Sequence, residues 1–159
     1  MEEIAKEYEG GVRHCYVLED REELFRAQVE RISDVPLKEN LRRAVRHLTI
    51  ESVDLGLFEL GKILEQQLRC FLKEARDKGV YDVGAQDLKR LVNMIDCVER
   101  NGIVKEKHHL TFLRQERNER AHGEIPDIAT RRRLMQLVPF LGGLFIDYVV
   151  FFHRRRELL

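Results

Sequence analysis

Residues 57–75 read LFELGKILEQQLRCFLKEA, and this stretch decides the fold class. Its apolar residues recur every three or four positions, a spacing that places them in one stripe along an α-helix. Gly79 follows shortly afterwards, and a glycine in this place is typical of a helix C-terminus. The stretch therefore predicts a long amphipathic helix with one face in a core. Its stripe consists of Leu57, Leu60, Leu64, Leu68, Phe71 and Ala75.

Helical spacing continues on both sides, and only three prolines interrupt the 159 residues, a length that suits one domain. The segment RHCYVL at 13–18 predicts a short strand or an extended lead-in. We expect further helices at 20–32, 37–49, 86–101, 106–122 and from Asp127 or Thr130 to about 156. The chain is thus predicted to be all-α. Residues 1–49 form an N-terminal extension with an extended lead-in and short helices, and residues 50–159 form an antiparallel bundle of four to five helices.

Composition excludes several classes of protein. Lys plus Arg and Asp plus Glu each number 28, so no global field attracts nucleic acid or lipid, and any affinity for phosphate is local. The three cysteines, Cys15, Cys70 and Cys97, lack the spacing of a zinc site or redox pair and predict buried thiols in a reducing compartment. The acidic start MEEIAKEYEGG does not resemble a secretory signal. We expect a cytoplasmic protein without metal or cofactor.

The last predicted helix is nearly all apolar. Residues 134–152 read LMQLVPFLGGLFIDYVVFF, just long enough to span a membrane. Asp147, Pro139 and the Gly142-Gly143 pair argue against a lipid environment, because they would leave a carboxylate and a weak helix in hydrocarbon. We predict a buried helix and no membrane span. Its apolar surface exceeds what short neighbours cover, which predicts a homodimer contact along it, with the glycine pair permitting close backbone approach.

The segment RNERAH at 117–122 carries the most distinctive chemistry. Asn118 and His122 are four residues apart and share a helix face, whereas Arg117 and His122 diverge by about 140°. Arg117 continues the apolar seam of its helix, where a charge is unusual. That seam consists of Leu110, Leu113, Arg117 and Ala121.

The same arginine-to-histidine spacing occurs in RRAVRH at 42–47. There Arg43 replaces the polar asparagine, and the sequence continues into LTI with no glycine stop. We interpret Arg42 and His47 as part of a solvated basic face with no role in a site.

FLRQERNERAHG at 112–123, followed by a turn and a long apolar helix and preceded by ELGKILEQQLRCFLKEA at 59–75, resembles the HEPN domain superfamily. The hallmark of this helical-bundle family is an arginine, usually followed by a polar residue, with a histidine four to six positions further on. The resemblance covers about residues 50–156. It implies a metal-independent endoribonuclease, a toxin or defence effector, that acts as a dimer with paired motifs in one cleft. Other members bind or scaffold without catalysis.

The resemblance also implies roles. His122 would transfer protons, Arg117 would stabilise the phosphate, and Asn118 would orient the imidazole or contact the RNA backbone. Because Arg117 and His122 diverge on one helix, a two-fold axis would bring a second copy of each into one composite cleft. Residues that could extend an RNA-contacting surface are Arg114, Arg120, Lys107, His108 and His109.

Two alternatives remain open. In the first, Arg117 pairs with a buried carboxylate such as Asp147 and His122 only caps a helix. In the second, the protein is a non-catalytic module that binds RNA, a nucleotide or a protein partner. A toxin would have an antitoxin or another protein as its partner. Family toxins regulated by nucleotidylation resemble one another in a tyrosine two residues after the histidine. This chain has Glu124 there, which speaks against that branch.

Overall fold

The computed structural model describes residues 21–121 and 126–159, and every regular element in these two ranges is helical. The all-α prediction is therefore confirmed for them, while the segment at 13–18 lies outside. Five of the helices have ten residues or more. The elements are α2 (Arg21–Leu24), α3 (Arg26–Val29), α4 (Val35–Arg46), α5 (Val53–Asp77), the 3-10 helix η1 (Gln86–Leu88), α6 (Leu91–Arg100), α7 (His108–Ala121) and α8 (Ile128–Glu157).

Helix α5 follows the sequence prediction closely. It ends where Gly79 adopts a positive φ of 65°, and the Val80 amide donates to the Ala75 carbonyl at 3.0 Å. Gly102, with φ 70°, ends α6 in the same manner. Because only glycine adopts this conformation without a steric penalty, both helix ends are determined locally.

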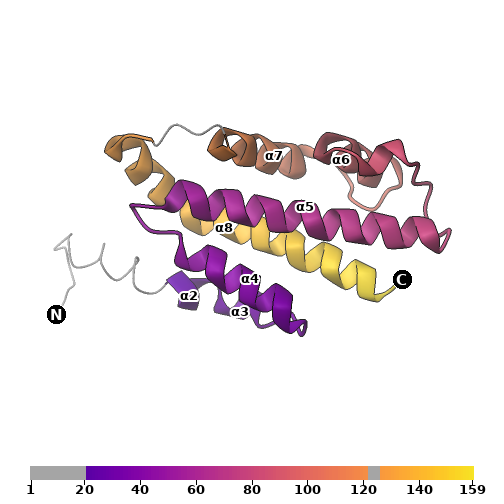
Figure 1. The fold of residues 1–159 in the computed structure, drawn as a ribbon, viewed down its shortest axis with the longest axis horizontal. Helices are drawn as coiled ribbons and strands as arrows, with labels where there is room; N and C mark the ends of the chain where they lie inside the picture. The colour runs from indigo at the N-terminus through magenta and orange to yellow at the C-terminus, as the bar shows by residue number, and fades with distance from the viewer. Residues whose placement is uncertain (1–20, 122–125) are drawn as a thin grey trace.

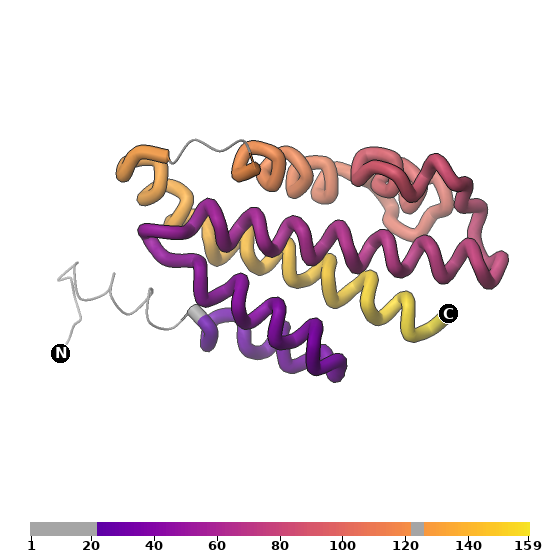
Figure 2. The backbone as a smooth tube through the Cα atoms, in the orientation of Figure 1, coloured from indigo at the N-terminus to yellow at the C-terminus, as the bar shows by residue number. Residues whose placement is uncertain are grey.

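Helices α5 and α8 lie side by side and run in the same direction, with α4 on one flank and α6 and α7 on the other (Figure 1). Phe71 of α5 packs on Phe152 of α8, and one turn further along Arg156 bonds Glu74. The trace in Figure 2 shows α6 and α7 together as the return path between α5 and α8. The antiparallel prediction thus holds between α5 and the α6–α7 segment, and between that segment and α8. It is wrong for the pair α5 and α8, because α6 and α7 together make one return path, so α8 runs in the same direction as α5.

One hydrophobic core joins the long helices, and the segment before residue 50 contributes to it with Phe25, Val29 and Leu41 among others. Phe25 lies directly on Gly142 of α8, where an added Cβ would come within 2.7 Å of its ring. The glycine at 142 therefore admits a side chain of the same subunit. Our expectation that it serves a backbone approach between subunits is wrong for the described structure.

Three predicted helices differ from the observed ones. The segment at 20–32 forms two short helices because Phe25, between them, leaves helical geometry and buries its ring. Helix α4 begins early, since Asp34 accepts from the Leu37 amide at 2.9 Å and Pro36 suits a first turn, and it ends at Arg46. The segment at 86–101 divides into η1 and α6, where the Asp87 carboxylate accepts from the Gly84 amide at 2.7 Å.

Helix α8 begins as predicted, with the Asp127 side chain accepting from the Thr130 amide at 2.8 Å. By length and composition it is apolar enough to cross a membrane, yet 50% of its most apolar stretch is buried in the bundle. The predicted end of α7 at Gly123 lies outside the described residues.

Candidate functional site

Arg117 lies one turn before the end of α7, and its aliphatic stem rests on Gly61 of α5. A Cβ added at position 61 would come within 2.3 Å of the Arg117 Cγ. The clashing atoms, Cβ and Cγ of Arg117, are close to the arginine backbone, so rotating the end of the side chain would not relieve the clash. Gly61 therefore lets α5 and α7 approach each other with a charged residue between them, which explains how an arginine occupies an apolar seam.

The guanidinium of Arg117 pairs with Glu65, one turn along α5 from Gly61. Arg117 Nη2 donates to Glu65 Oε1 at 2.5 Å, and Arg69 Nη2 donates to the other carboxylate oxygen at 3.0 Å. The Arg117 side chain is 22% exposed. The expected alternative partner, Asp147, is exposed and instead accepts from Gln28 at 2.6 Å. The Arg117–Asp147 pairing is wrong because α7 turns Arg117 towards α5.

Two further contacts orient Arg117. Its guanidinium carbon lies 5.8 Å from the centroid of the Phe58 ring, on which Lys62 also stacks at 5.6 Å. Nη1 donates to the Asn118 Oδ1 at 3.4 Å, a long hydrogen bond. The Arg117 Nε is buried and has no hydrogen-bond partner within the described ranges. Among the described residues, this donor is therefore unsatisfied and enclosed by protein atoms.

Arg117 borders a cleft of about 450 Å³ that opens between α4, α5 and α7. Four cations and two carboxylates line it, so the wall carries a local positive excess in a chain with no net charge. The lining residues are Asn40 and Arg43 of α4, Glu59, Lys62, Ile63, Glu65, Gln66 and Arg69 of α5, and Arg117 of α7. We call this space the Arg117 cleft.

His122 and Glu124 lie outside the described residues, so the predicted contact between Asn118 and His122 stays a prediction. The described part of α7 ends at Ala121, which is exposed rather than in the apolar seam as expected. The seam therefore closes with Arg117, because Leu110 and Leu113 before it are buried.

The predicted auxiliary RNA contacts are dispersed. Arg120 is mostly buried and pairs with Glu119 and Glu116, and burial raises the pKa of Glu116 although Arg120 counteracts the shift. Arg114 is half-buried and lies three residues before Arg117 in α7. Lys107 pairs with Asp96 at 2.7 Å.

The two histidines at the start of α7 are also remote from Arg117. His108 is exposed, and the His109 Nδ1 lies 3.2 Å from the Tyr148 hydroxyl of α8. Nine residues separate His108 from Arg117, about 13 Å along a helix. The structure does not bring Lys107, His108 or His109 to the Arg117 cleft.

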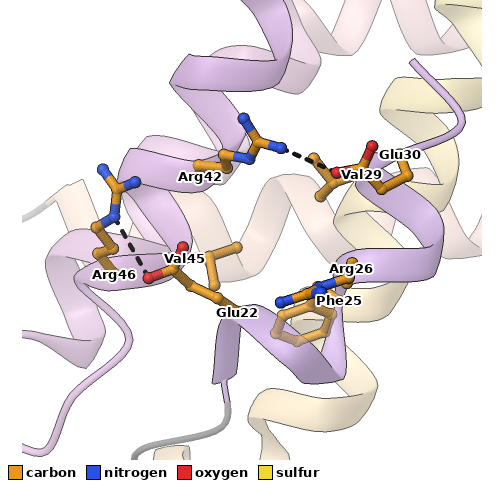
Figure 3. Close-up of a pocket in the computed structure, with 8 residues that line it drawn as sticks. All are labelled: Glu22, Phe25, Arg26, Val29, Glu30, Arg42, Val45 and Arg46. Carbon is orange, nitrogen blue, oxygen red and sulfur yellow. Dashed lines mark hydrogen bonds and ion pairs between the residues drawn. The ribbon is translucent and has the colours of Figure 1, made fainter. Parts of the chain in front are cut away.

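Arg42, in the second arginine-histidine segment, holds together the N-terminal helices. Within α4, Arg42 donates to Glu39 at 3.1 Å. It also donates to Glu30 at 2.9 Å, and Arg46 donates to Glu22 at 3.4 Å (Figure 3). These side chains border a separate pocket of about 430 Å³ between α2, α3 and α4. Arg42 and Arg46 are thus both neutralised by carboxylates, so this pocket offers phosphate little free positive charge.

His47 does not lie on a solvated face as we expected. It follows the last residue of α4 and is half-buried, and its Nδ1 hydrogen bonds Glu59, which lines the Arg117 cleft. The reason is that α4 ends at Arg46, and the following turn directs the imidazole towards α5.

Sequence reasoning missed several residues that the fold assembles around Arg117. One local signal pointed to them: a glycine inside a strong helical stripe, which often marks a close packing contact. The i, i+4 pair of Glu65 and Arg69 is also visible in the sequence, but it resembles an ordinary surface pair. The missed residues are Asn40, Arg43, Phe58, Glu59, Gly61, Lys62, Glu65, Gln66 and Arg69.

Within residues 21–121 and 126–159 no group of three or more His, Cys, Asp or Glu side chains is arranged to hold a metal ion. Of the two cysteines described there, Cys97 is buried as predicted and Cys70 is partly exposed. Comparison with models of known protein families, with curated proteins and with solved structures finds no match to this chain. The site must therefore be interpreted from its own chemistry.

Proposed function

We propose that the protein is a metal-independent endoribonuclease of the HEPN type, a toxin or defence effector. The observation that carries the proposal is Arg117. It is a permanently charged guanidinium in an apolar seam, seated on a glycine, at the edge of a cleft with excess positive charge. Asn118 follows it directly and His122 comes five positions later, the order that the HEPN resemblance requires.

The proposed reaction transfers a phosphoryl group within the RNA, from the 5′-oxygen of one nucleotide to the 2′-oxygen of the nucleotide before it. A histidine acting as base removes the proton of a 2′-hydroxyl, whose oxygen attacks the adjacent phosphorus. The bond to the 5′-oxygen breaks, and that oxygen receives a proton from an acid, leaving a 2′,3′-cyclic phosphate and a 5′-hydroxyl. Arg117 stabilises the extra negative charge on the phosphate oxygens. His122 supplies the proton transfer, and Asn118 orients its ring or contacts the backbone.

The ion pair with Glu65 fits this role. A guanidinium has five N–H donors, and Glu65 occupies one of those of Arg117 in the free protein. Glu65 also bonds Arg69, so it keeps a cationic partner when phosphate draws Arg117 away. Glu65 thereby holds the arginine in place without blocking it.

A second candidate function has a specific observation in its favour. Because Arg117 already has a carboxylate partner, it can be a structural ion pair in a non-catalytic helical module that binds RNA, a nucleotide or a protein. Removing one partner of such a pair leaves an uncompensated charge and destabilises the fold, which is a structural reason for the pair. An activity measurement separates the two functions.

We also propose a homodimer through α8. One face of this helix presents apolar side chains at spacings of three and four, the pattern of a helix-pairing seam. Phe140 is 59% exposed, and Phe112 of α7 packs beside it. The seam is continuous with an apolar groove of about 520 Å³ between α8 and residues 103–106, the segment that precedes α7. The residues of the α8 seam are Leu137, Phe140, Leu144, Tyr148 and Phe151.

Light scattering tests the dimer. Wild type should have the mass of two chains at micromolar concentration, and Phe140→Glu should have the mass of one, because a charge in the seam opposes pairing. Gln136→Glu, which changes an exposed position one residue off the seam, should remain dimeric. A monomeric wild type with full activity would refute the proposal.

The catalytic proposal is tested by RNA cleavage in the presence of EDTA. Wild type should cleave a single-stranded RNA, and His122→Ala should lose at least about a hundredfold in rate, as expected for loss of general acid-base catalysis. Cleavage abolished by EDTA would reject the metal-independent mechanism. Equal cleavage by wild type and His122→Ala would reject the site, and no cleavage by wild type would favour the binding module.

A further inference from the structure

The Arg117 cleft contains charge that the proposed reaction does not use. Both of its carboxylates have cationic or imidazole partners, since Glu59 bonds His47 and Glu65 bonds Arg69 and Arg117. Arg43 and Lys62 have no carboxylate partner within residues 21–121 and 126–159. The free positive charge of the cleft is therefore concentrated on these two side chains.

These two cations come from different walls. Arg43 projects from α4 and bonds the Asn40 side chain at 3.0 Å, whereas Lys62 stands on α5 over the Phe58 ring. Helix α5 lies between α4 and α7 (Figure 1). Lys62 shares the Phe58 ring with Arg117, and Arg43 comes from the α4 wall of the same cleft, so the cations extend from α7 across α5 to α4. A chain of phosphates laid across α5 would contact Arg117 first and then Lys62 and Arg43.

The other lining groups indicate what kind of ligand fits. The amides of Asn40 and Gln66 can donate to or accept from sugar and phosphate oxygens. No aromatic ring is among the lining residues, so the cleft offers no platform for base stacking. Cations and amides without a stacking surface recognise a nucleic-acid backbone irrespective of sequence.

We propose that the cleft between α4, α5 and α7 binds the phosphate backbone of single-stranded RNA, with Lys62 and Arg43 holding the phosphates next to the one at Arg117. This inference rests on the proposed ribonuclease function and extends it to the substrate path. It also gives the N-terminal extension a role, because α4 forms one wall of the substrate site.

Binding can be measured separately from cleavage. In full-length His122→Ala, the fluorescence anisotropy of a short labelled single-stranded RNA is followed over a series of salt concentrations. Adding Lys62→Ala or Arg43→Ala should weaken binding about tenfold. Each should also reduce the slope of log affinity against log salt by about 0.7, the value for one lost phosphate contact on a single strand.

The matched control is Lys78→Ala on the same background. Lys78 caps the far end of α5 and pairs with Glu74, about 24 Å along the helix from Lys62. It removes one charge from the same helix outside the cleft, so affinity and slope should stay unchanged. If Lys62→Ala and Arg43→Ala behave like Lys78→Ala, or if the RNA does not bind, the inference is wrong. Circular dichroism verifies that each variant is folded.

The outcomes also separate this inference from the proposed function. If wild type does not cleave RNA but His122→Ala binds it through Lys62 and Arg43, the catalytic proposal fails and the backbone cleft stands. If wild type cleaves and both cleft variants bind like the control, the reaction stands and the substrate path lies elsewhere.

Discussion

The chain contains two segments with the same arginine-to-histidine spacing, RNERAH in α7 and RRAVRH in α4, and their surroundings differ completely. Arg117 packs on a glycine of a neighbouring helix and borders a cleft in which Arg43 and Lys62 have no carboxylate partner among the described residues. Arg42 lies on the surface, where Glu30 and Glu39 neutralise it. The comparison teaches that spacing does not define a site. What defines it is the element beneath the arginine and the charge left over around it.

The largest expected difference between the segments is in catalysis. Arg117→Ala should reduce RNA cleavage by about 10²- to 10³-fold, because one charge-stabilising donor to a transition state contributes on this order. Arg42→Ala and His47→Ala should remain within about twofold of wild type, since neither contacts the reacting phosphate. Single-turnover cleavage rates give the measurement. A comparable loss in His47→Ala, in a protein that is folded, would show that both segments take part.

Mixing two variant proteins tests whether Arg117 and His122 of one site come from different subunits of the dimer. Arg117→Ala and His122→Ala proteins, each inactive alone, should regain up to about half of wild-type activity when mixed and allowed to exchange, because about half of randomly mixed dimers are heterodimers. The single composite cleft of each heterodimer keeps one intact Arg117 and one intact His122. Activity that stays at the level of the separate variants would place both residues of a site in the same subunit.

A substitution at Gly61 tests the packing contact between Arg117 and α5. In Gly61→Ala the new methyl group collides with the Arg117 stem, and overpacking of this kind costs about 1–3 kcal/mol, more than the roughly 1 kcal/mol that alanine adds to helix stability. Urea unfolding should therefore show a loss of stability, and cleavage should fall at least tenfold because the guanidinium is displaced. Gly143→Ala is the control: its Cβ would meet nothing closer than 3.9 Å, so stability should rise by up to about 1 kcal/mol.

The smallest expected effect concerns the ion pairs of Arg42. Lys38 first, and then Arg42, hold the pKa of Glu30 below its usual value. A carboxyl whose pKa is lowered by folding stabilises the native state above the pKa of the unfolded chain, and this contribution disappears as the pH falls through the folded pKa. Glu30→Gln should thus be slightly less stable than wild type at pH 7 and equal to it once the pH has fallen through the lowered pKa of Glu30 in the folded protein. Urea midpoints measure the difference, which should also shrink in high salt. A difference that persists in acid would contradict the assignment.

The sequence by itself determined the elements whose causes are local. The apolar stripe of α5, its end at Gly79 and the start of α8 after Asp127 could all be predicted, because hydrophobic periodicity, positive φ and capping involve residues within a few positions of one another. Arg117 and Asn118 also stood out in the sequence, as a charge in an apolar seam with a polar neighbour. Local signals were insufficient where packing intervened, as at Phe25, which interrupts a predicted helix to reach α8.

Only the tertiary structure decided what surrounds Arg117. Its carboxylate partner is 52 positions away in the sequence, and Glu65 could be distinguished from Asp147 only once α7 lay across Gly61. The cleft likewise required α4 to pack on α5, which placed Arg43 beside Lys62. The physical reason is that an ion pair or a cleft depends on the separation and rotation of whole helices. Those are determined by the fit of all buried side chains together, and no short stretch of sequence contains that information.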